Sequence, residues 1–391
     1  MRALAAMAVF FFHLEFIERE MITTFQGTEA PLIGGAFLNG YAGVDLFFVI
    51  SGFIIVYVTG RAEPGRYPLG SFLFARAARI YPSWWLFATV MAAYFWYSYG
   101  APWDVEEVAS EDRSPVWHLF ASYALFPQDD FPLLGVGWTL VHEMHFYLVF
   151  GMLLLLPYRW RVIGLFAWAG LVLAGGLAGL AGPFAKDLVH LIFSPLTLEF
   201  LMGGLAALLV VNGYRWRPGL FAVAGVLGLG LAMVFHDLSA NPDWTLVWGR
   251  VIWFGIPSAV LAYGLVSLDL EGRFRRLPGI SALGDWSYAL YLSHMLVLSA
   301  IHRVYFAAAN IGEAYFGVPT WAANLLRVGS PGPMDNLFLM VSGLAACLIT
   351  AWLTYRFFEQ PMLRLASRAR ARLFSGRALG LEPQPIRAMV W

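Results

Sequence analysis

The chain has 391 residues, of which 60% are hydrophobic and only 13% are charged, and its formal net charge is zero. Soluble globular proteins carry about 25% charged residues, so this composition excludes a soluble enzyme or binding protein. Apolar runs of about twenty residues recur along the chain, which predicts an all-α, polytopic transmembrane helical bundle. We expect about ten spanning helices, with approximate centres at Val9, Val49, Thr89, Val149, Val172, Ala206, Gly228, Pro257, Tyr291 and Ala346.

The connecting segments alternate in charge. Those that would follow the second, fourth, sixth and eighth helices, together with the C-terminal tail, carry most of the Lys and Arg residues. The positive-inside rule then places both termini in the cytoplasm. Residues 1–366 are expected to form the membrane domain, and 367–391 a basic cytoplasmic tail on the anionic inner leaflet. The first helix has no small-residue cleavage site and is expected to remain as a signal anchor.

The first predicted helix, Arg2 to Phe16, carries Arg2 at its start and His13 eleven positions later. Eleven helical steps bring two side chains within roughly 20° of one direction and separate them by about 16 Å. With Arg2 at the cytoplasmic boundary, His13 would lie near the middle of a hydrocarbon core about 30 Å thick. An ionisable side chain at that depth indicates a functional site, although a hydrogen-bonded structural histidine is the alternative.

Charged residues also fall in the second and third predicted helices. Asp45 lies in the outer half of the second, within GYAGVDLFFVISGF, where a carboxylate must be paired, protonated or exposed to a wet cavity. Arg76 and Arg79, within FLFARAARIYPSWW, begin the third helix and share one face. They either anchor the helix at the inner boundary or bind phosphate oxygens through bidentate hydrogen bonds.

The fourth predicted helix, GWTLVHEMHFYLVF, places Glu143 near its outer end, with Tyr147 on the same face. His142 and His145 suggest a metal, but a zincin motif needs two histidines four residues apart with a glutamate between them. These two are only three apart, so we expect no metal site. Glu199, in the sixth helix, is another carboxylate predicted to be buried.

The ninth predicted helix, GDWSYALYLSHMLV, places Ser287, Tyr291 and His294 on one continuous stripe. Such a stripe is either a polar lining or a hydrogen-bonded seam between helices. No GxSxG, Walker A or GxGxxG motif is present, which disfavours a serine hydrolase or a nucleotide-binding enzyme.

The predicted depths suggest a mechanism. The arginines would lie at the inner face, His13 at the centre, and Asp45 and Glu143 toward the outside. This order suits an anionic cytoplasmic donor that passes a group to an acceptor arriving from the other side. A proton-coupled transporter or flippase of a glycan or small solute would carry similar polar groups, so it remains the alternative.

Six motifs in order resemble the acyltransferase 3 family of bacterial integral-membrane acyltransferases. They are the Arg-x10-His spacing of Arg2 and His13, GVDLFFVISGF around Asp45, FxxxRxxRIxP from Phe72 to Pro82, WTLxxExxFY from Trp138 to Tyr147, SYxxYLxH from Ser287 to His294, and ExP at Glu359 to Pro361. One motif alone is weak evidence, whereas the ordered set is specific. The fourth motif, with SPLTLEFLMGG later, is most similar to the branch that acetylates exopolysaccharides.

The resemblance implies transfer of an acyl group, usually acetyl from acetyl-CoA, to a hydroxyl of a cell-surface or lipid-linked glycan. It implies a multi-pass protein of the bacterial cytoplasmic (inner) membrane, with membrane lipids around it and no nucleic acid partner. His13 matches the essential histidine of the family and Arg2 its partner. Arg76 and Arg79 match the donor-side arginines, and Glu143 matches the glutamate of its motif.

The residue chemistry suggests roles for these side chains. An imidazole is a common general base, so we expect His13 to remove the proton of the acceptor hydroxyl. Asp45 or Glu143 is expected to orient His13, as a carboxylate does in a catalytic triad. Two further sets complete the predicted site. The expected CoA phosphate ligands are Arg2, Arg76 and Arg79, and the expected substrate-binding residues are Trp138, Tyr147, Ser287, Tyr291 and His294.

Overall fold

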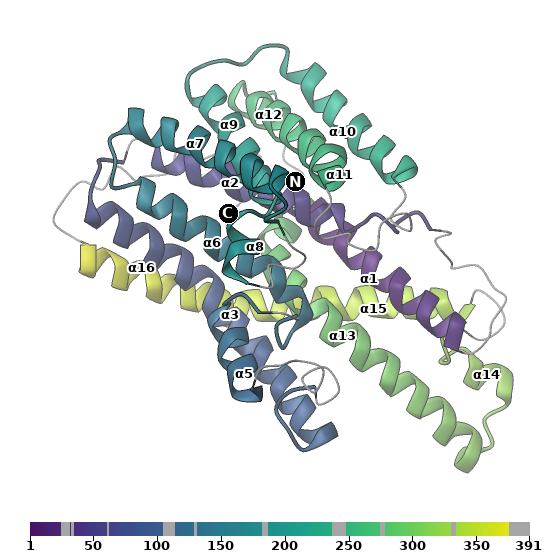
Figure 1. Cartoon of the computed structure of the whole chain (residues 1–391). Helices are drawn as coiled ribbons and strands as arrows, with labels where there is room; N and C mark the ends of the chain where they lie inside the picture. The colour runs from purple at the N-terminus through teal and green to yellow at the C-terminus, as the bar shows by residue number, and fades with distance from the viewer. Residues whose placement is uncertain are drawn as a thin grey trace.

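The computed structural model describes residues 1–24, 32, 35–60, 62–104, 114–128, 131–181, 187–236, 248–273, 278–329 and 334–374. Every regular element in these ranges is a helix (Figure 1). The elements are α1 (Arg2–Thr24), α2 (Ala42–Thr59), α3 (Arg66–Tyr99), α5 (Pro115–Ala124), η1 (Gly135–Gly137), α6 (Trp138–Leu153), α7 (Tyr158–Leu177), α8 (Leu188–Ile192), α9 (Thr197–Val211), α10 (Pro218–Phe235), α11 (Trp248–Arg250), η3 (Val251–Gly255), α12 (Ile256–Leu270), α13 (Pro278–Phe316), α14 (Thr320–Asn324), α15 (Met334–Thr354), η4 (Tyr355–Glu359) and α16 (Gln360–Phe374).

All ten predicted helix centres lie within helices of the structure. Among the described residues, seven helical segments are long and apolar enough to cross a membrane, so the chain is a polytopic helical membrane protein. These segments are Ala42–Thr59, Tyr158–Leu177, Leu188–Val211, Pro218–Phe235, Trp248–Leu270, Pro278–Phe316 and Met334–Phe374. The predicted helices outside this set are α1, α3 and α6. These three helices carry most of the candidate site residues.

The helices pack as pairs around two apolar clusters. α2 lies against α9, α10 against α12, and α13 against both α1 and α15 (Figure 1). The larger cluster lies around α2, α6 and α9 and includes a stack of aromatic rings in which Phe200 contacts Phe48 and Phe146, each at 4.5 Å between centroids. A second cluster joins α1, α13 and α15. Several candidate site residues, including Trp138, Tyr147 and Tyr291, belong to the larger cluster.

Glycines allow α2 and α9 to approach closely. A Cβ atom at Gly52 would lie 1.9 Å from the carbonyl oxygen of Phe200, and one at Gly203 would lie 2.0 Å from that of Val49. Backbones so close leave no room for a side chain, and small residues commonly mark such contacts between membrane helices. The α2–α9 contact therefore depends on glycine at both positions.

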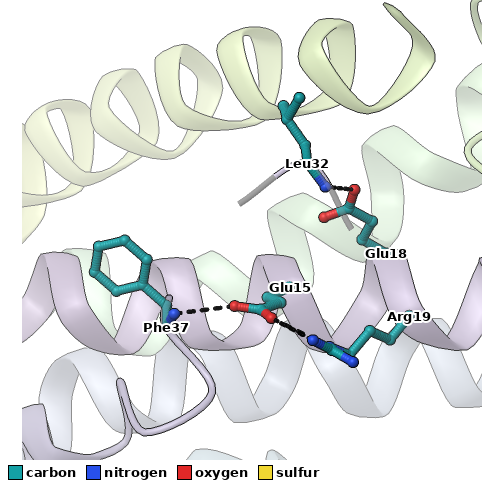
Figure 2. Close-up of polar contacts among 5 residues, drawn as sticks. All are labelled: Glu15, Glu18, Arg19, Leu32 and Phe37. Atoms are coloured by element: carbon teal, nitrogen blue, oxygen red, sulfur yellow. Dashed lines mark hydrogen bonds and ion pairs between the residues drawn. The ribbon is translucent and has the colours of Figure 1, made fainter. Parts of the chain in front are cut away.

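Buried carboxylates attach the segment after α1 to α1 itself (Figure 2). Glu15, whose side chain is 1% exposed, accepts hydrogen bonds from the backbone N–H of Phe37 at 3.1 Å and from the Arg19 guanidinium at 3.0 and 3.1 Å. Glu18 accepts one from the backbone N–H of Leu32 at 2.6 Å. Backbone donors away from water need such partners, so these bonds hold Leu32 and Phe37 against the second half of α1.

An ion pair connects α2 to α11. Asp45 and Arg250 are both 0% exposed. The Arg250 guanidinium donates from Nε to Oδ1 of Asp45 at 2.7 Å and from Nη2 to Oδ2 at 3.0 Å. It also lies over the rings of Tyr41 and Trp138, and the Glu199 carboxyl is close enough to interact electrostatically. Of the three environments expected for Asp45, the structure shows the paired one.

Two helical segments are much longer than a membrane is thick. α13 has 39 residues, and α15, η4 and α16 form a continuous helix of 41 residues. At 1.5 Å per residue each extends roughly 60 Å, about twice the hydrocarbon thickness. α16 packs against the first half of α3, where Arg370 Nε donates to Ser71 Oγ at 2.7 Å and Phe374 contacts Phe74. The predicted boundary at residue 366 falls inside α16, and 375–391 lie outside the described residues.

Substitution of Gly52 by Ala should weaken the α2–α9 contact. The added methyl group overlaps the Phe200 carbonyl, and overpacking of this kind typically costs about 1–3 kcal/mol. Thermal unfolding of the purified protein in detergent measures the loss. Gly230→Ala, on α10, is the matched control because a Cβ there meets no atom within 4 Å. An unchanged melting temperature for Gly52→Ala contradicts the prediction.

Substitution of Asp45 by Ala should destabilise the protein by about 3–5 kcal/mol, because it leaves the buried Arg250 charge without its partner. The double variant Asp45→Leu, Arg250→Met removes both charges and should lose less stability than Asp45→Ala alone. Unfolding in detergent under identical conditions compares the two. A loss in the double variant as large as that of Asp45→Ala, or larger, would contradict an ion pair as the source of the effect.

Candidate active site

Two histidines meet where α1 packs against α13. His294 Nε2 lies 3.1 Å from His13 Nδ1, and the ring centroids are 4.8 Å apart. His13 Nδ1 is also 2.9 Å from the carbonyl oxygen of Val9, and His294 Nδ1 is 3.1 Å from that of Leu290. His294 is 1% exposed, whereas His13 is partly exposed. We call His13 and His294 the histidine pair.

The same two helices meet again nearer the start of α1, where Arg2 Nε donates to Ser287 Oγ at 3.1 Å. α1 and α13 therefore run parallel, since the second contact lies further toward the C-terminal end on both helices. Eleven residues separate the contacts on α1 and seven on α13, or about 16 and 10 Å. The long Arg2 side chain spans the difference. The spacing within each helix thus brings an arginine and a histidine of α1 to one stripe of α13.

A group of charged and aromatic side chains surrounds Arg2. We call these residues the arginine cluster: Arg2, Arg76, Arg79, Glu143, Tyr147, Tyr288 and Glu359.

Most contacts within the arginine cluster join different helices. Arg79 of α3 lies 3.6 Å from the Glu359 carboxylate of η4, and its guanidinium is 5.9 Å from the Tyr288 ring centroid. The Arg76 guanidinium lies over the Tyr147 ring at 5.6 Å. Glu143 accepts a hydrogen bond from Ser51 at 2.9 Å and another from the Tyr147 hydroxyl. Helices α1, α2, α3, α6, α13 and η4 therefore converge on this cluster.

The arginine cluster has more positive than negative groups. It contains three guanidinium groups and two carboxylates, Glu143 and Glu359. In the part of the chain that the structure describes, Arg76 Nε and Arg79 Nη2 are buried without an acceptor, and both carboxylate oxygens of Glu359 are buried without a hydrogen-bond donor. Buried donors without partners are unfavourable, and a phosphate or other anion would satisfy them. The cluster is therefore suited to bind an anion.

The structure corrects the separation predicted between these residues. Glu143 contacts Ser51, which lies in the middle of α2, and the arginines surround this same level. Arg2 is close enough to interact electrostatically with both Arg79 and Glu143, so the expectation that Glu143 lies apart from the arginines is wrong. α3 begins at Arg66, about three turns before Arg76, and α16 covers this extra length. Arg76 and Arg79 consequently lie well inside their helix.

The structure also corrects the partner predicted for His13. Asp45 is bound to Arg250, and Glu143 is bound to Ser51 and Tyr147. Neither carboxylate hydrogen-bonds to His13, whose side-chain partners are the Val9 carbonyl and His294. The predicted carboxylate support is therefore absent from these described contacts, and a second imidazole takes that place.

The stripe of α13 is a hydrogen-bonded seam. Ser287 bonds to Arg2, and His294 bonds to His13. Between them, the Tyr291 hydroxyl lies 2.8 Å from Thr139 Oγ1 and donates to the Val136 carbonyl at 3.1 Å. Of the two readings offered for this stripe, the structure shows the interhelical seam, and it includes His13.

The remaining predicted site residues lie at separate positions. Tyr147 belongs to the arginine cluster, whereas Trp138 is 7% exposed and packs beneath Arg250. His142 Nδ1 is 3.0 Å from the Trp138 carbonyl, while His145 packs on the ring of Trp168. The two histidines thus face different neighbours.

Several polar residues near the site were not assigned a role from the sequence, among them Glu359, Ser51 and Arg370. Glu359 lies in the ExP motif, and its Glu-Pro spacing was the available signal. Ser51 lies in the GVDLFFVISGF motif around Asp45, which was the available signal for it. Arg370 lies near enough to Arg76 to interact electrostatically, and it extends the positive charge along α3. Its signal would have been the helical pattern that continues from α15 into α16.

Comparison with known proteins adds independent evidence. An acyltransferase domain family matches residues 1–356. The chain is 31% identical over 363 residues to the exopolysaccharide production protein ExoZ of Rhizobium meliloti (strain 1021), which covers 88% of this chain and 95% of that protein. It is 25% identical over 397 residues to the acyltransferase MdmB of Streptomyces mycarofaciens, covering 95% and 92%.

A third relative is longer. The chain is 22% identical over 395 residues to a putative O-acetyltransferase of Staphylococcus aureus (strain COL), covering 94% of this chain and 57% of that protein. No solved structure matches. The family match covers most of the chain and includes both the histidine pair and most of the arginine cluster. The protein is therefore a membrane acyltransferase that belongs to the acyltransferase 3 family.

Proposed function

We propose that the protein transfers an acetyl group from cytoplasmic acetyl-CoA to a hydroxyl of a cell-surface or lipid-linked glycan, and that His13 is the general base. The main support is the placement of His13. Its imidazole is partly exposed and has two contacts at Nδ1. It lies on the same helix as Arg2, which belongs to the positively charged arginine cluster. The names of the relatives, O-acetyltransferase and exopolysaccharide production protein, support the acyl group and the class of acceptor.

The arginines supply the donor side. Four arginines lie in a row beside α3, which we call the arginine row: Arg370, Arg76, Arg79 and Arg2. The row ends at Arg2, which lies on the same helix as His13. Guanidinium groups bind phosphates through two parallel hydrogen bonds, and Arg76 and Arg79 have donors available. CoA carries its thioester at the end of a long pantetheine arm, far from its phosphates. Phosphates on the arginine row and a thioester beside His13 therefore fit one extended donor.

The acyl transfer needs one base. His13 removes the proton from the acceptor hydroxyl as the oxygen attacks the thioester carbonyl. The new C–O bond forms, the C–S bond breaks, and the departing CoA thiolate takes the proton from the imidazolium. This direct transfer requires no serine or cysteine nucleophile, and Cys347 is buried against α13.

The proposed topology has ten spans, both termini in the cytoplasm, and residence in the bacterial cytoplasmic membrane. Basic residues on the proposed inner side support this orientation. The parallel contact of α1 with α13 fits a first and a ninth span that run the same way. The antiparallel contact of α10 with α12, where Gly225 faces Leu261 and Gly264 faces Ala222, fits two consecutive spans.

Substitution of His13 by Ala should lower kcat by about 10²–10⁴-fold, the usual contribution of a general base, while acetyl-CoA still binds. The assay measures CoA thiol release by purified protein in lipid nanodiscs. The substrates are acetyl-CoA and surface polysaccharide from a strain in which the gene for this protein is deleted. Calorimetric titration with acetyl-CoA measures donor binding. A wild-type rate in the His13→Ala variant would contradict the assignment.

The same assay distinguishes the proposed transferase from the transporter alternative. A transporter or flippase moves solute without consuming acetyl-CoA, so wild-type protein would release no CoA thiol when polysaccharide is added. Release that requires the polysaccharide supports the transferase and excludes the alternative.

The double substitution Arg76→Ala, Arg79→Ala should raise the Kd for acetyl-CoA by about tenfold or more per arginine, because charged hydrogen bonds contribute about 1.5–3 kcal/mol each. Arg364→Ala is the matched control, since Arg364 lies on α16 but is exposed and bonded only weakly to Gln360. Titration calorimetry compares the three proteins. Normal acetyl-CoA binding by the double variant would show that the donor side is assigned wrongly.

A further inference from the structure

The hydrogen bonds of His294 define its tautomer. Its Nδ1 faces the Leu290 carbonyl oxygen at 3.1 Å, and a carbonyl only accepts, so the hydrogen of His294 is on Nδ1. His294 is buried, and no described carboxylate is bonded to it, so the ring is neutral and carries a single N–H. Its Nε2 is therefore an acceptor, and it is directed at His13.

The same reasoning fixes the tautomer of His13. Its Nδ1 has two neighbours that accept, the Val9 carbonyl at 2.9 Å and His294 Nε2 at 3.1 Å. One hydrogen on Nδ1 is shared between them, and shared hydrogens of this kind are common in proteins. A neutral His13 with its hydrogen on Nδ1 has a lone pair on Nε2. Within the described ranges, no residue hydrogen-bonds to that nitrogen.

We propose that His294 is a positioning residue that, together with the Val9 carbonyl, holds His13 in the Nδ1–H tautomer and makes Nε2 the basic nitrogen. This inference rests on the proposed function, because it assigns the atom that accepts the proton from the acceptor hydroxyl. When Nε2 takes that proton, the Nδ1–H bond to Val9 and His294 remains, and both acceptors stabilise the imidazolium. A carboxylate does this in a catalytic triad, and here a neutral imidazole does it.

His294 does not serve as the base itself. Its Nε2 accepts the hydrogen of His13 Nδ1, and the residue is only 1% exposed. If His294 were only a filler of the seam, any side chain of similar volume would replace it. A positioning role instead requires an acceptor at the place of Nε2, which distinguishes the two possibilities.

The tautomer is measured directly by nitrogen-15 NMR of the full-length protein, labelled at histidine and reconstituted in lipid bilayers without donor or acceptor. The His13 signals are identified by their loss in His13→Gln. We expect a protonated Nδ1 and an unprotonated Nε2 in the wild type. His294→Leu keeps the volume but removes one of the two acceptors and leaves the Val9 carbonyl, so the share of the Nδ1–H form should fall. His294→Gln places an amide oxygen at the former Nε2 position, and should keep the Nδ1–H form.

His142→Leu is the matched control. His142 is also a buried histidine whose Nδ1 contacts a carbonyl four residues earlier, that of Trp138 at 3.0 Å, and it has no bond to His13. Its removal should leave the His13 signals unchanged. Wild-type His13 signals in His294→Leu, or a protonated Nε2 in the wild type, would overturn the proposal.

Activity gives the second measurement. In the CoA thiol assay, His294→Leu should lower kcat roughly 10- to 100-fold, part of the usual contribution of a general base, without changing KM for acetyl-CoA. His294→Gln should recover most of the lost kcat. Equal losses in the two variants would overturn the proposal. Full activity in His13→Ala would instead refute the proposed function. The tautomer measurement does not depend on activity, so it shows separately whether the proposal about His294 holds.

Discussion

The parallel contact between α1 and α13 brings the polar groups of this protein together. Each helix alone carries widely spaced polar side chains, and neither has an inward stripe that is polar throughout. Packed in parallel, they match Arg2 with Ser287 and His13 with His294. The apolar cluster shared by α1, α13 and α15 supports this contact. α3 and α6 then add their charged residues at one level of the seam.

The protein treats its buried charges in two different ways. Asp45 and Arg250 satisfy each other through two hydrogen bonds and connect α2 to α11, as a structural ion pair does. The arginine cluster is not balanced in this way, and two of its donors have no acceptor among the described residues. An unpaired buried donor is unfavourable and is uncommon in native proteins, so it calls for an explanation such as a bound ion or a catalytic role. The Asp45–Arg250 pair thus has the features of a structural ion pair, whereas the arginine cluster has the features of a ligand-binding site.

Much of the fold was predictable from the sequence, because long apolar runs in a membrane have few alternatives to helices. All ten predicted helix centres lie in helices. Helix ends were harder, since α3 begins well before its apolar stretch and is covered there by α16. Arg76 and Arg79 therefore lie well inside α3 and not at its start, because the charged start of an apolar run was mistaken for the start of the helix.

The sequence predicted which polar side chains share a helix face, but not which side chains they contact on other helices. Spacing within one helix shows which side chains share a face, and it identified the stripe of Ser287, Tyr291 and His294. It does not show which helices meet, so the expected partner of His13 was a carboxylate. Arg250 was missed as the partner of Asp45 for the same reason, because about two hundred residues separate them. Only the packing of α1 on α13 and of α2 on α11 supplies this information.

The separation between the arginine cluster and the histidine pair sets a minimum length for the donor. Along α13, Ser287 and His294 are about 10 Å apart, and along α1, Arg2 and His13 are about 16 Å apart. In the proposed mechanism, a donor held by its anion must carry its reactive carbonyl across this gap. An acyl phosphate, whose carbonyl adjoins its charge, is too short to do so. The bundle would therefore select among activated acyl compounds by reach, in addition to their reactivity.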